Sequence, residues 1–279
     1  MADIHLTTVD QVETFRLEGF LKRVYPKPKS EFLCSHGKWW YRGDENRWVI
    51  LSGDDVAAYF AIIPTKCLIK GVREPAFWWV DLIVAPEFRG RGLQTFIDRK
   101  IRERTEIKLG FPNVSVAKIH EGHGWGVRRD LQVMLLPLWP LRVKRVHFTD
   151  GLIGCMLRLG AVTMTPLVML NRLRLTHYVP ISARFLESAS ADLLETIFLK
   201  YKREDTIMTY RDADYFQWRY FEAPYRSELV FYVDGANSRS AHCVIARHVR
   251  FQDVMTTRIL DVFGDFDDLW LVDFPRRDR

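Results

Sequence analysis

The sequence has few cysteines and none of the paired-cysteine motifs that build zinc ribbons or thioredoxin-type redox sites. The four cysteines lie far apart in its 279 residues, and no Cys-x-x-Cys occurs. Free thiols suit a reducing compartment. The first residues also lack the apolar core of a secretory signal peptide. We therefore expect a cytoplasmic protein. The cysteines are Cys34, Cys67, Cys155 and Cys243.

Long apolar runs are also missing. The most apolar stretch, 151–175, is interrupted by Arg158 and Pro166, so its uncharged runs fall short of the ~20 residues that a membrane span needs. A transmembrane helix is therefore not expected. Arg172 and Arg174 end the stretch, and its alternation of apolar residues with arginines leaves peripheral membrane contact open as an alternative.

The net charge of +6 and the pI near 9.1 are not concentrated in basic runs. No five consecutive residues are Lys or Arg, and charges of both signs alternate along the chain. We therefore expect no nucleic-acid partner. The apolar share of 48% and the aromatic share of 13% are enough to fill substantial cores, and the length favours two domains.

The pattern of apolar residues predicts an α/β (α+β) protein. Alternation and short apolar runs predict strands, while apolar residues at helical spacing predict helices. Helices are expected at 9–23, 93–109 and 190–203, and strands at 47–53, 56–69, 77–85, 113–119, 131–139, 228–235, 241–249 and 256–264.

A W-x-Y motif followed by strands occurs twice in the sequence. Trp39 and Tyr41 precede an apolar strand with one aspartate, Asp81, and the same order recurs with Trp218-Arg219-Tyr220 before Asp261 at nearly equal spacing. We interpret this as a duplicated unit. The expected domains are 1–145, an apolar helical linker at 146–177, and a second, incomplete domain at 178–279.

The first copy carries a glycine-rich turn between a strand and a helix, at Arg89, Gly90, Arg91 and Gly92. Backbone N–H groups at a helix N-terminus favour a bound anion, and glycine lets the backbone approach it closely. The turn lacks both the G-x-G-x-x-G dinucleotide pattern and the Walker lysine. The turn therefore favours a ligand that carries phosphate, but it does not distinguish between ligands of this class.

The residues around this turn resemble the acetyl-CoA loop of the GCN5-related N-acetyltransferases (GNATs). Val84, Pro86, Arg89, Gly90, Gly92 and Leu93 fit its V-x-P-x-x-R-G-x-G-L form, although Gln94 stands where a small residue is usual. Residues 113–125, NVSVAKIHEGHGW, keep the spacing of a second family motif, N-x-x-A-x-x-L-Y-x-x-x-G-F, with changes at its apolar positions. The resemblance covers about residues 10–140. In its tandem form the chain resembles a subgroup of the family with two such domains in one chain.

The resemblance implies a twisted mixed sheet flanked by helices and splayed between two central strands, followed by a second partial GNAT-like domain. It implies that acyl-CoA, such as acetyl-CoA, lies in the splay, with an amine acceptor entering from the opposite side. The resemblance assigns the backbone of Ile83 and Val84 to the pantetheine arm. It assigns the pyrophosphate to the turn, and it adds Asn113 to the cofactor site. The residues of the turn are Arg89, Gly90, Arg91, Gly92, Leu93 and Gln94.

Two residues are candidates for proton transfer. His120 stands where the resembling family often has an acidic tyrosine, and a histidine that titrates near ~6.5 can donate a proton at neutral pH. Asp81 is a carboxylate in an apolar strand, which must be paired or have a raised pKa, so it is a candidate base. Each has a structural alternative: His120 as a helix-start residue and Asp81 as an anchor to neighbouring elements. A His120–His123 metal pair lacks a third ligand, so no metal is expected.

The second copy lacks the R-G-x-G turn and has Asp265, Asp267 and Asp268 in its place, whose charge repels phosphate. We therefore expect a non-catalytic copy that closes one wall of the acceptor cleft. The sequence predicts an N-acyltransferase that moves an acyl group from acyl-CoA to an amine of a small molecule, such as an amino sugar or amino acid derivative, by direct attack in a ternary complex. A non-catalytic CoA-binding protein and a peripheral membrane enzyme with a long-chain donor remain alternatives, and the sequence sets no oligomeric state.

Overall fold

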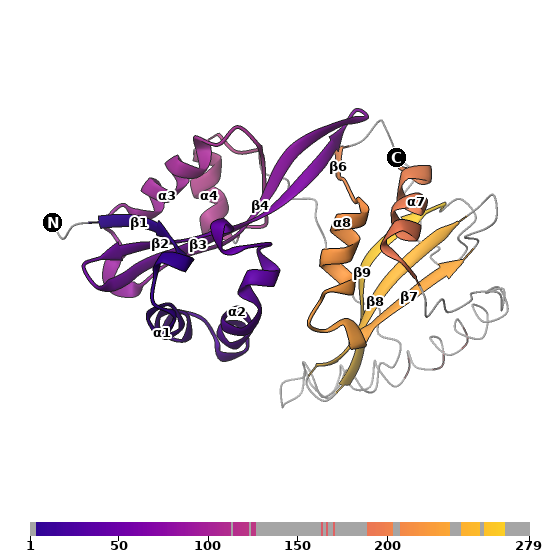
Figure 1. Ribbon diagram of the computed structural model, residues 1–279, viewed down its shortest axis with the longest axis horizontal. Helices are drawn as coiled ribbons and strands as arrows, with labels where there is room; N and C mark the ends of the chain where they lie inside the picture. The colour runs from indigo at the N-terminus through magenta and orange to yellow at the C-terminus, as the bar shows by residue number, and fades with distance from the viewer. Residues whose placement is uncertain are drawn as a thin grey trace. The chain divides into compact units, whose positions relative to one another are not determined.

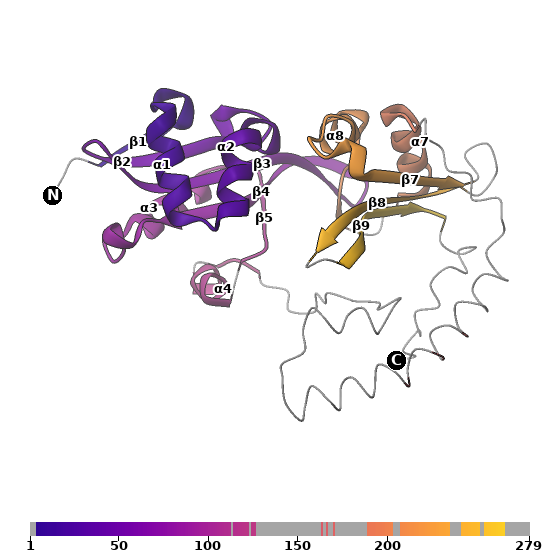
Figure 2. The ribbon, with the colours of Figure 1, turned by 90° about the horizontal axis from the view of Figure 1, so that it is seen from below.

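The computed structural model describes residues 4–112, 114–122, 124–126, 189–202, 207–234, 241–251 and 254–265, with positions 163, 166 and 170. The chain divides into two compact units. The first comprises Met1–Val127 and Arg203–Pro224, and the second comprises Arg128–Lys202 and Tyr225–Arg279. Figures 1 and 2 together show the elements of each unit with their labels.

The first unit is a twisted mixed sheet with the strand order β1-β2-β3-β4-β5. All neighbours pair antiparallel except β4 and β5, which are parallel. Strand β6 adds to the far end of β3, where Cys67–Ile69 pair with Ile207–Thr209. The strands are β1 (Ile4–Thr8), β2 (Arg47–Ser52), β3 (Asp55–Ile69), β4 (Val72–Val84), β5 (Ile107–Gly110) and β6 (Ile207–Thr209).

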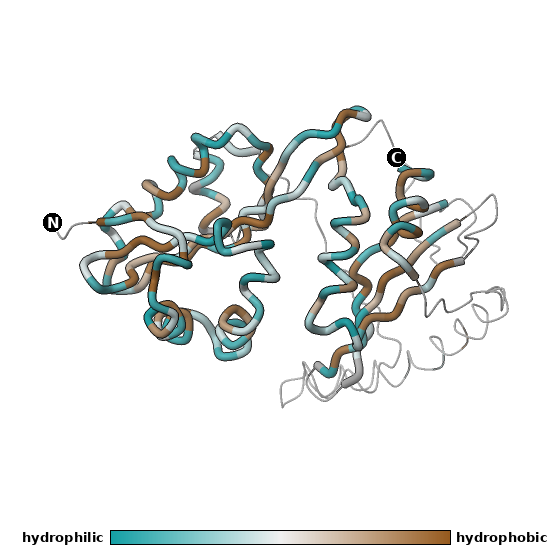
Figure 3. The backbone as a smooth tube through the Cα atoms, viewed as in Figure 1, coloured by the Kyte–Doolittle hydropathy of each residue, from teal (hydrophilic) through white to brown (hydrophobic). Residues whose placement is uncertain are grey.

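Helices cover both faces of this sheet (Figures 1 and 2). Helices α1 (Thr14–Val24) and α2 (Lys27–Trp40) cover one face, and α3 (Leu93–Arg102) and α4 (Val114–Gly122) belong to the other. Along α1 and α2 the backbone alternates between hydrophobic and hydrophilic segments (Figure 3), as expected for helices that bury one side. Each face has its own apolar core.

The second unit is a three-stranded antiparallel sheet, β7 (Leu229–Asp234), β8 (His242–Phe251) and β9 (Val254–Gly264). Helix α7 (Ala191–Tyr201) packs on it and buries Leu194, Ile197 and Phe198. Its N-cap, Ser190, accepts a hydrogen bond from the Leu193 amide at 3.2 Å, which fixes where the helix begins.

The two sheets share a register shift next to an aspartate. Between β3 and β4 the register shifts so that Asp81 pairs with Ala61 and Trp79 with Ile62, which leaves Val80 as an extra residue. Between β8 and β9 the same shift leaves Leu260 extra, one residue before Asp261. Each copy therefore places its aspartate directly after a β-bulge, where the strand bends.

Residues 203–224 are where the expected domain division and the structure differ. The sequence placed them in the domain at 178–279, but they pack with the first unit. Helix α8 (Ala213–Phe216) continues into a π-helical turn, Gln217–Phe221, which brings Trp218 against Trp39. The two indoles exchange hydrogen bonds, with Trp39 Nε1 to the Trp218 carbonyl at 3.0 Å and Trp218 Nε1 to the Trp39 carbonyl at 2.7 Å. The two W-x-Y motifs are thus bonded to each other. The linker at 146–177 lies almost wholly outside the described residues.

Several element predictions were wrong in detail. The segment 113–119 is not a strand, because its described residues form α4, and the helix expected at 93–109 ends at Arg102 and is followed by β5. The helix expected at 9–23 begins at Thr14. Strand β1 and helix α2 were not expected. The strand expected at 131–139 lies outside the described residues.

Candidate functional site

The sheet of the first unit opens between its two parallel strands. Strand β5 pairs with β4 only from Ala76 to Trp79, where Trp79 meets Gly110. Beyond Trp79, β4 continues to Val84 and stays paired with β3 on its other side, with Ile83 opposite Tyr59 and Val84 opposite Ala58. Within the described residues, the β5-facing edge of β4 therefore has no strand partner after Trp79. An extended ligand chain can pair with such an edge.

The open edge leads into the glycine turn. Helix α3 begins at Leu93 with Gly92 as its N-cap, and Gly90 and Gly92 have φ angles of 74° and 77°. Only glycine takes this left-handed conformation without strain. A Cβ atom on either glycine would meet nothing within 4 Å, so open space adjoins the turn. The turn is therefore a left-handed glycine loop that faces open space at a helix N-terminus.

The turn can hold an anion. The first amides of α3 have no acceptor within the helix, and the helix dipole is positive at this end. The side chains of Arg89 and Arg91 are exposed beside it and are held by backbone carbonyls, Arg89 Nε to Val84 O at 3.3 Å and Arg91 Nη2 to Glu87 O at 3.1 Å. The Gln94 Nε2 atom is covered by protein and has no hydrogen-bond partner among the described residues. Asn113, which the sequence added to this site, lies outside the described residues.

His120 lies on the α3 face of the sheet. It is buried on α4, with ring centroids 5.0 Å from Trp79 and 4.8 Å from Trp125. Its Nδ1 atom lies 3.6 Å from Oδ1 of Asp98, a fully buried residue of α3 that also pairs with Arg102 at 3.0 Å. Sequence reasoning missed Asp98. The signal was a carboxylate between the buried Ile97 and Ile101 on a helix whose other charges face solvent.

Asp81 lies in a polar cluster on the α1/α2 face. Oδ1 accepts from Tyr25 at 3.0 Å and from Lys29 at 2.5 Å, and Oδ2 accepts from Tyr41 at 2.6 Å. Burial, together with the nearby carboxylate, raises the pKa of Tyr25 far above its ordinary value, and burial likewise raises the pKa of Tyr41. Both phenols therefore keep their protons and donate hydrogen bonds to Asp81. The expectation that this carboxylate must be paired fits these contacts, and of its partners only Tyr41 stood out in the sequence.

The bulge at Val80 separates the two catalytic candidates. Before it, Phe77 and Trp79 point to the α3 side, and after it Asp81 and Ile83 point to the α1/α2 side. His120 contacts Trp79 on the first side, whereas Asp81 contacts Tyr25 and Tyr41 on the second. The structure brings the turn residues and the open edge of β4 together, but it does not bring His120 and Asp81 together. Their chemical roles stay predictions.

No protein-family model matches the chain, and no curated protein matches it. Solved structures do. N-myristoyltransferase of Saccharomyces cerevisiae with bound myristoyl-CoA aligns over 96% of this chain and 64% of its own, with a TM-score of 0.50 and 10% identity. The same enzyme with myristoyl-CoA and inhibitors aligns over 96% and 65%, with a TM-score of 0.53 and 13% identity. A GCN5-related N-acetyltransferase from Kribbella flavida aligns over 95% and 59%, with a TM-score of 0.47 and 14% identity.

N-myristoyltransferase is a two-domain enzyme with the GNAT fold. This chain has the GNAT fold. The expected fold class is thereby confirmed, including the mixed sheet flanked by helices. The chain spans less than two thirds of the length of the myristoyltransferase structures that it matches.

The last strand of the second unit ends differently from β4 of the first unit. Where β4 leads into open space, β9 ends at Gly264, at which a Cβ atom would collide with the backbone of Ala241 and His242. The amide of Asp265 donates to the Ala241 carbonyl at 2.9 Å, so this strand end is closed against β8. Asp267 and Asp268 lie outside the described residues. Through Asp265, the last residue that the structure describes, the end of β9 therefore lacks the open space that adjoins Gly90 and Gly92.

Two further observations concern metals and membranes. In the ranges described above, no three His, Cys, Asp or Glu residues lie close enough to hold a metal ion, and His123 is outside those ranges. No helix of the described chain combines the length and apolar character that a membrane crossing requires.

Proposed function

We propose that this protein is an N-acyltransferase that uses an acyl-CoA as donor. The observation that carries the proposal is the continuity of the open β4 edge with the glycine turn at the N-terminus of α3. An extended, amide-bearing chain that ends in a pyrophosphate matches both features at once, and coenzyme A has this chemistry.

The donor is assigned by the chemistry of each part. The pantetheine arm pairs with the backbone of β4 near Ile83 and Val84, and the pyrophosphate lies against the amides from Gly90 to Gln94. Arg89 and Arg91 add positive charge beside the turn. The myristoyl-CoA bound to the structurally similar myristoyltransferase supports an acyl-CoA donor, although the fold by itself does not choose the acyl length.

The reaction is direct transfer. The neutral amine of the acceptor attacks the thioester carbon, the C–S bond breaks, the new amide nitrogen loses a proton, and the departing thiolate takes one. His120 is the proposed source of that proton. Its Nδ1 atom lies 3.6 Å from Oδ1 of Asp98, and Nε2 is the nitrogen that we propose as the donor. Asp81 remains the candidate base for the acceptor's ammonium proton, with Tyr25, Lys29 and Tyr41 already bonded to it.

Gly92→Asn tests donor binding. Asparagine tolerates the left-handed conformation better than other side chains, so the fold survives, while the new side chain fills the space that the pyrophosphate needs. Isothermal titration should show loss of binding of both acetyl-CoA and myristoyl-CoA. The matched control is Gly53→Asn, a second left-handed glycine with open space around its Cβ position, which lies in the β2–β3 connection and is not part of the turn. Unchanged donor affinity in folded Gly92→Asn would remove the acyl-CoA assignment.

A second assay separates an enzyme from a CoA-binding protein. The release of free CoA thiol is followed with a panel of primary amines and with acetyl-CoA or myristoyl-CoA as donor. An N-acyltransferase releases thiol only when donor and a suitable amine are both present. A protein that binds donor but releases no thiol with any amine would be a non-catalytic CoA-binding protein.

A further inference from the structure

The first unit contains a polar cavity of about 400 Å³ that the donor site does not use. This volume lies within the usual range for sites that hold small molecules. The loop after α2, the far end of β3 and the segment around α8 supply its walls. Its lining residues are Arg42, Glu45, Asn46, Pro64, Thr65, Lys66, Tyr210, Asp212, Asp214 and Tyr215. We call it the β3–α8 pocket.

The walls of the β3–α8 pocket are tied in place. Lys66 on β3 pairs with Asp212 at 2.7 Å, and Asp212 also caps α8 by accepting from the Tyr215 amide at 2.9 Å. The Tyr210 amide donates to the Lys66 carbonyl at 2.8 Å. Opposite walls from distant parts of the sequence are therefore bonded directly to each other, as expected for a built cavity.

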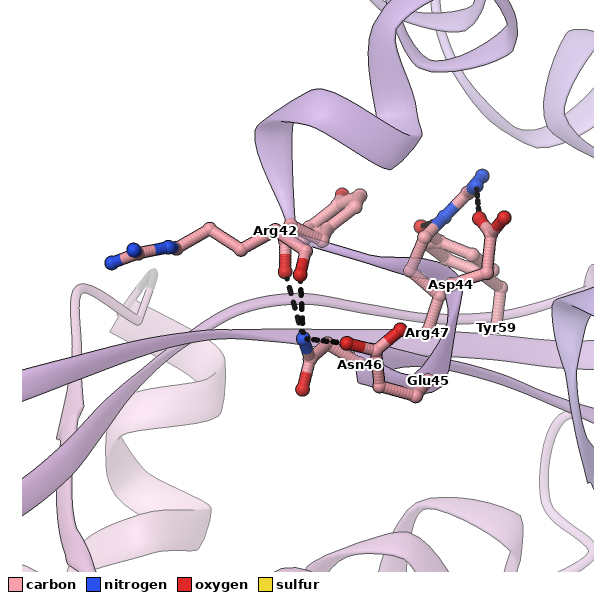
Figure 4. A network of polar contacts seen from close by, with 7 residues as sticks. Arg42, Asp44, Glu45, Asn46, Arg47 and Tyr59 are labelled. Atoms are coloured by element: carbon pink, nitrogen blue, oxygen red, sulfur yellow. Dashed lines mark hydrogen bonds and ion pairs between the residues drawn. The ribbon is translucent and has the colours of Figure 1, made fainter. Parts of the chain in front are cut away.

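The loop that forms the third wall is held by buried polar contacts (Figure 4). Asn46 Nδ2 donates to the carbonyls of Tyr41 at 3.0 Å and Arg42 at 3.3 Å, and its amide oxygen points away from them. Arg47 donates to Asp44 at 2.7 Å and to the Tyr59 hydroxyl at 3.3 Å. The network fixes Arg42, whose φ is 59°, in a left-handed conformation, and this sets the rim of the pocket.

Three charged groups of the pocket have no ion-pair partner in the described part of the chain. Glu45 and Asp214 are exposed carboxylates, and the guanidinium of Arg42 lies 5.0 Å from the Trp218 ring centroid. The remaining charges, Lys66 and Asp212, neutralise each other. The lining therefore carries an excess of negative charge together with hydroxyl, amide and tyrosine groups.

The position of the pocket relates it to the opening of the sheet. Pro64 pairs with Phe77, two residues before Trp79, where β4 and β5 separate. At ~3.4 Å per residue this places the pocket wall ~7 Å along the sheet from that point, on the side away from the glycine turn. Tyr41 connects the pocket lining to Asp81, because its backbone carbonyl accepts from Asn46 and its hydroxyl donates to Asp81.

We infer that the β3–α8 pocket binds the acceptor and that the acceptor is an amino sugar. The inference rests on the proposed N-acyltransferase function, because an acceptor presupposes a donor. The hydroxyl groups of a sugar ring can bond to both the hydrogen-bond acceptors and the donors of the pocket lining. The ring itself can pack against the tyrosine side chains of the lining. The excess negative charge attracts an ammonium-bearing sugar and disfavours an amine that also carries a carboxylate.

Isothermal titration with glucosamine as the probe tests the inference, on the full chain at neutral pH with saturating free CoA. Glucosamine should bind, and glucose and alanine should bind more weakly. Asp214→Asn and Glu45→Gln should each weaken glucosamine binding by about tenfold or more, since hydrogen bonds to charged groups are worth this much. The control Asp55→Asn, an exposed carboxylate at the other end of β3, should leave it unchanged.

The outcomes separate this inference from the proposed function. Wild-type affinity for glucosamine in both pocket variants, or tighter binding of alanine than of glucosamine, would overturn the inference. Titration of acetyl-CoA into the same proteins reports on the donor site alone and should give one affinity for all of them. Failure of acetyl-CoA to bind the wild type would instead remove the proposed function.

Discussion

Asp81 offers a sharp test of how the first unit is held together. Its carboxylate accepts hydrogen bonds from two phenols, and Tyr41, one of the two, is fully buried. Hydrogen bonds to charged groups contribute about 1.5–3 kcal/mol each. The ammonium of Lys29 adds little, because that side chain is nearly half exposed.

We therefore expect Asp81→Ala to lower the free energy of unfolding of the first unit by about 3–5 kcal/mol, since both phenols lose their acceptor. Asp81→Asn keeps one acceptor oxygen and should cost about 1–3 kcal/mol. Tyr41→Phe removes only the bond to Oδ2 and should cost about 1.5–3 kcal/mol. In the double variant Asp81→Asn/Tyr41→Phe the two costs should not add, because both changes remove the same contact.

Urea unfolding followed by tryptophan fluorescence measures these costs. The fluorescence reports mainly on the first unit, which contains seven of the nine tryptophans: Trp39, Trp40, Trp48, Trp78, Trp79, Trp125 and Trp218. An Asp81→Ala protein as stable as the wild type would refute the structural reasoning. A fall in kcat of ~10²-fold or more in a fully stable Asp81→Asn protein would instead show a chemical role.

Three other predictions concern separate parts of the first unit. His120→Ala should lower kcat for thiol release by ~10²–10⁴-fold with unchanged acetyl-CoA affinity, as loss of a general acid requires, and full kcat in the folded variant would end that assignment. Trp218→Phe removes the donor to the Trp39 carbonyl and should cost about 1–2 kcal/mol in urea unfolding, whereas no change would show that water replaces the indole. Burial acts to raise the pKa of Asp212, but the hydrogen bonds from Lys66 and from a backbone amide outweigh it and lower that pKa below its ordinary 3.8. The stability that this ion pair provides should therefore be present above pH ~4 and be lost as the pH falls through the lowered value. The stability difference between wild type and Asp212→Asn, which keeps the helix cap, should shrink in the same range, and a difference independent of pH would contradict the pairing.

Local patterns of residues were enough to locate several elements of the fold. Alternating and continuous apolar residues located the central strands β2, β3 and β4, because burial of a strand face acts on every second residue. The spacing of Gly90 and Gly92 before an amphipathic segment located the turn and the start of α3, because left-handed backbone needs glycine. The pattern of apolar residues likewise located the three strands and the helix of the second unit.

Features that depend on contacts between residues distant in the sequence could not be predicted from local patterns. A segment rich in β-branched residues forms helix α4, because local preference for a strand is weak against the packing that the rest of the chain provides. The return of 203–224 to the first unit follows from the exchange of bonds between Trp39 and Trp218, which no local pattern shows. The separation of His120 from Asp81 likewise depends on one extra residue, Val80. A bulge reverses the faces of every residue after it, and it is defined only by the register between two strands.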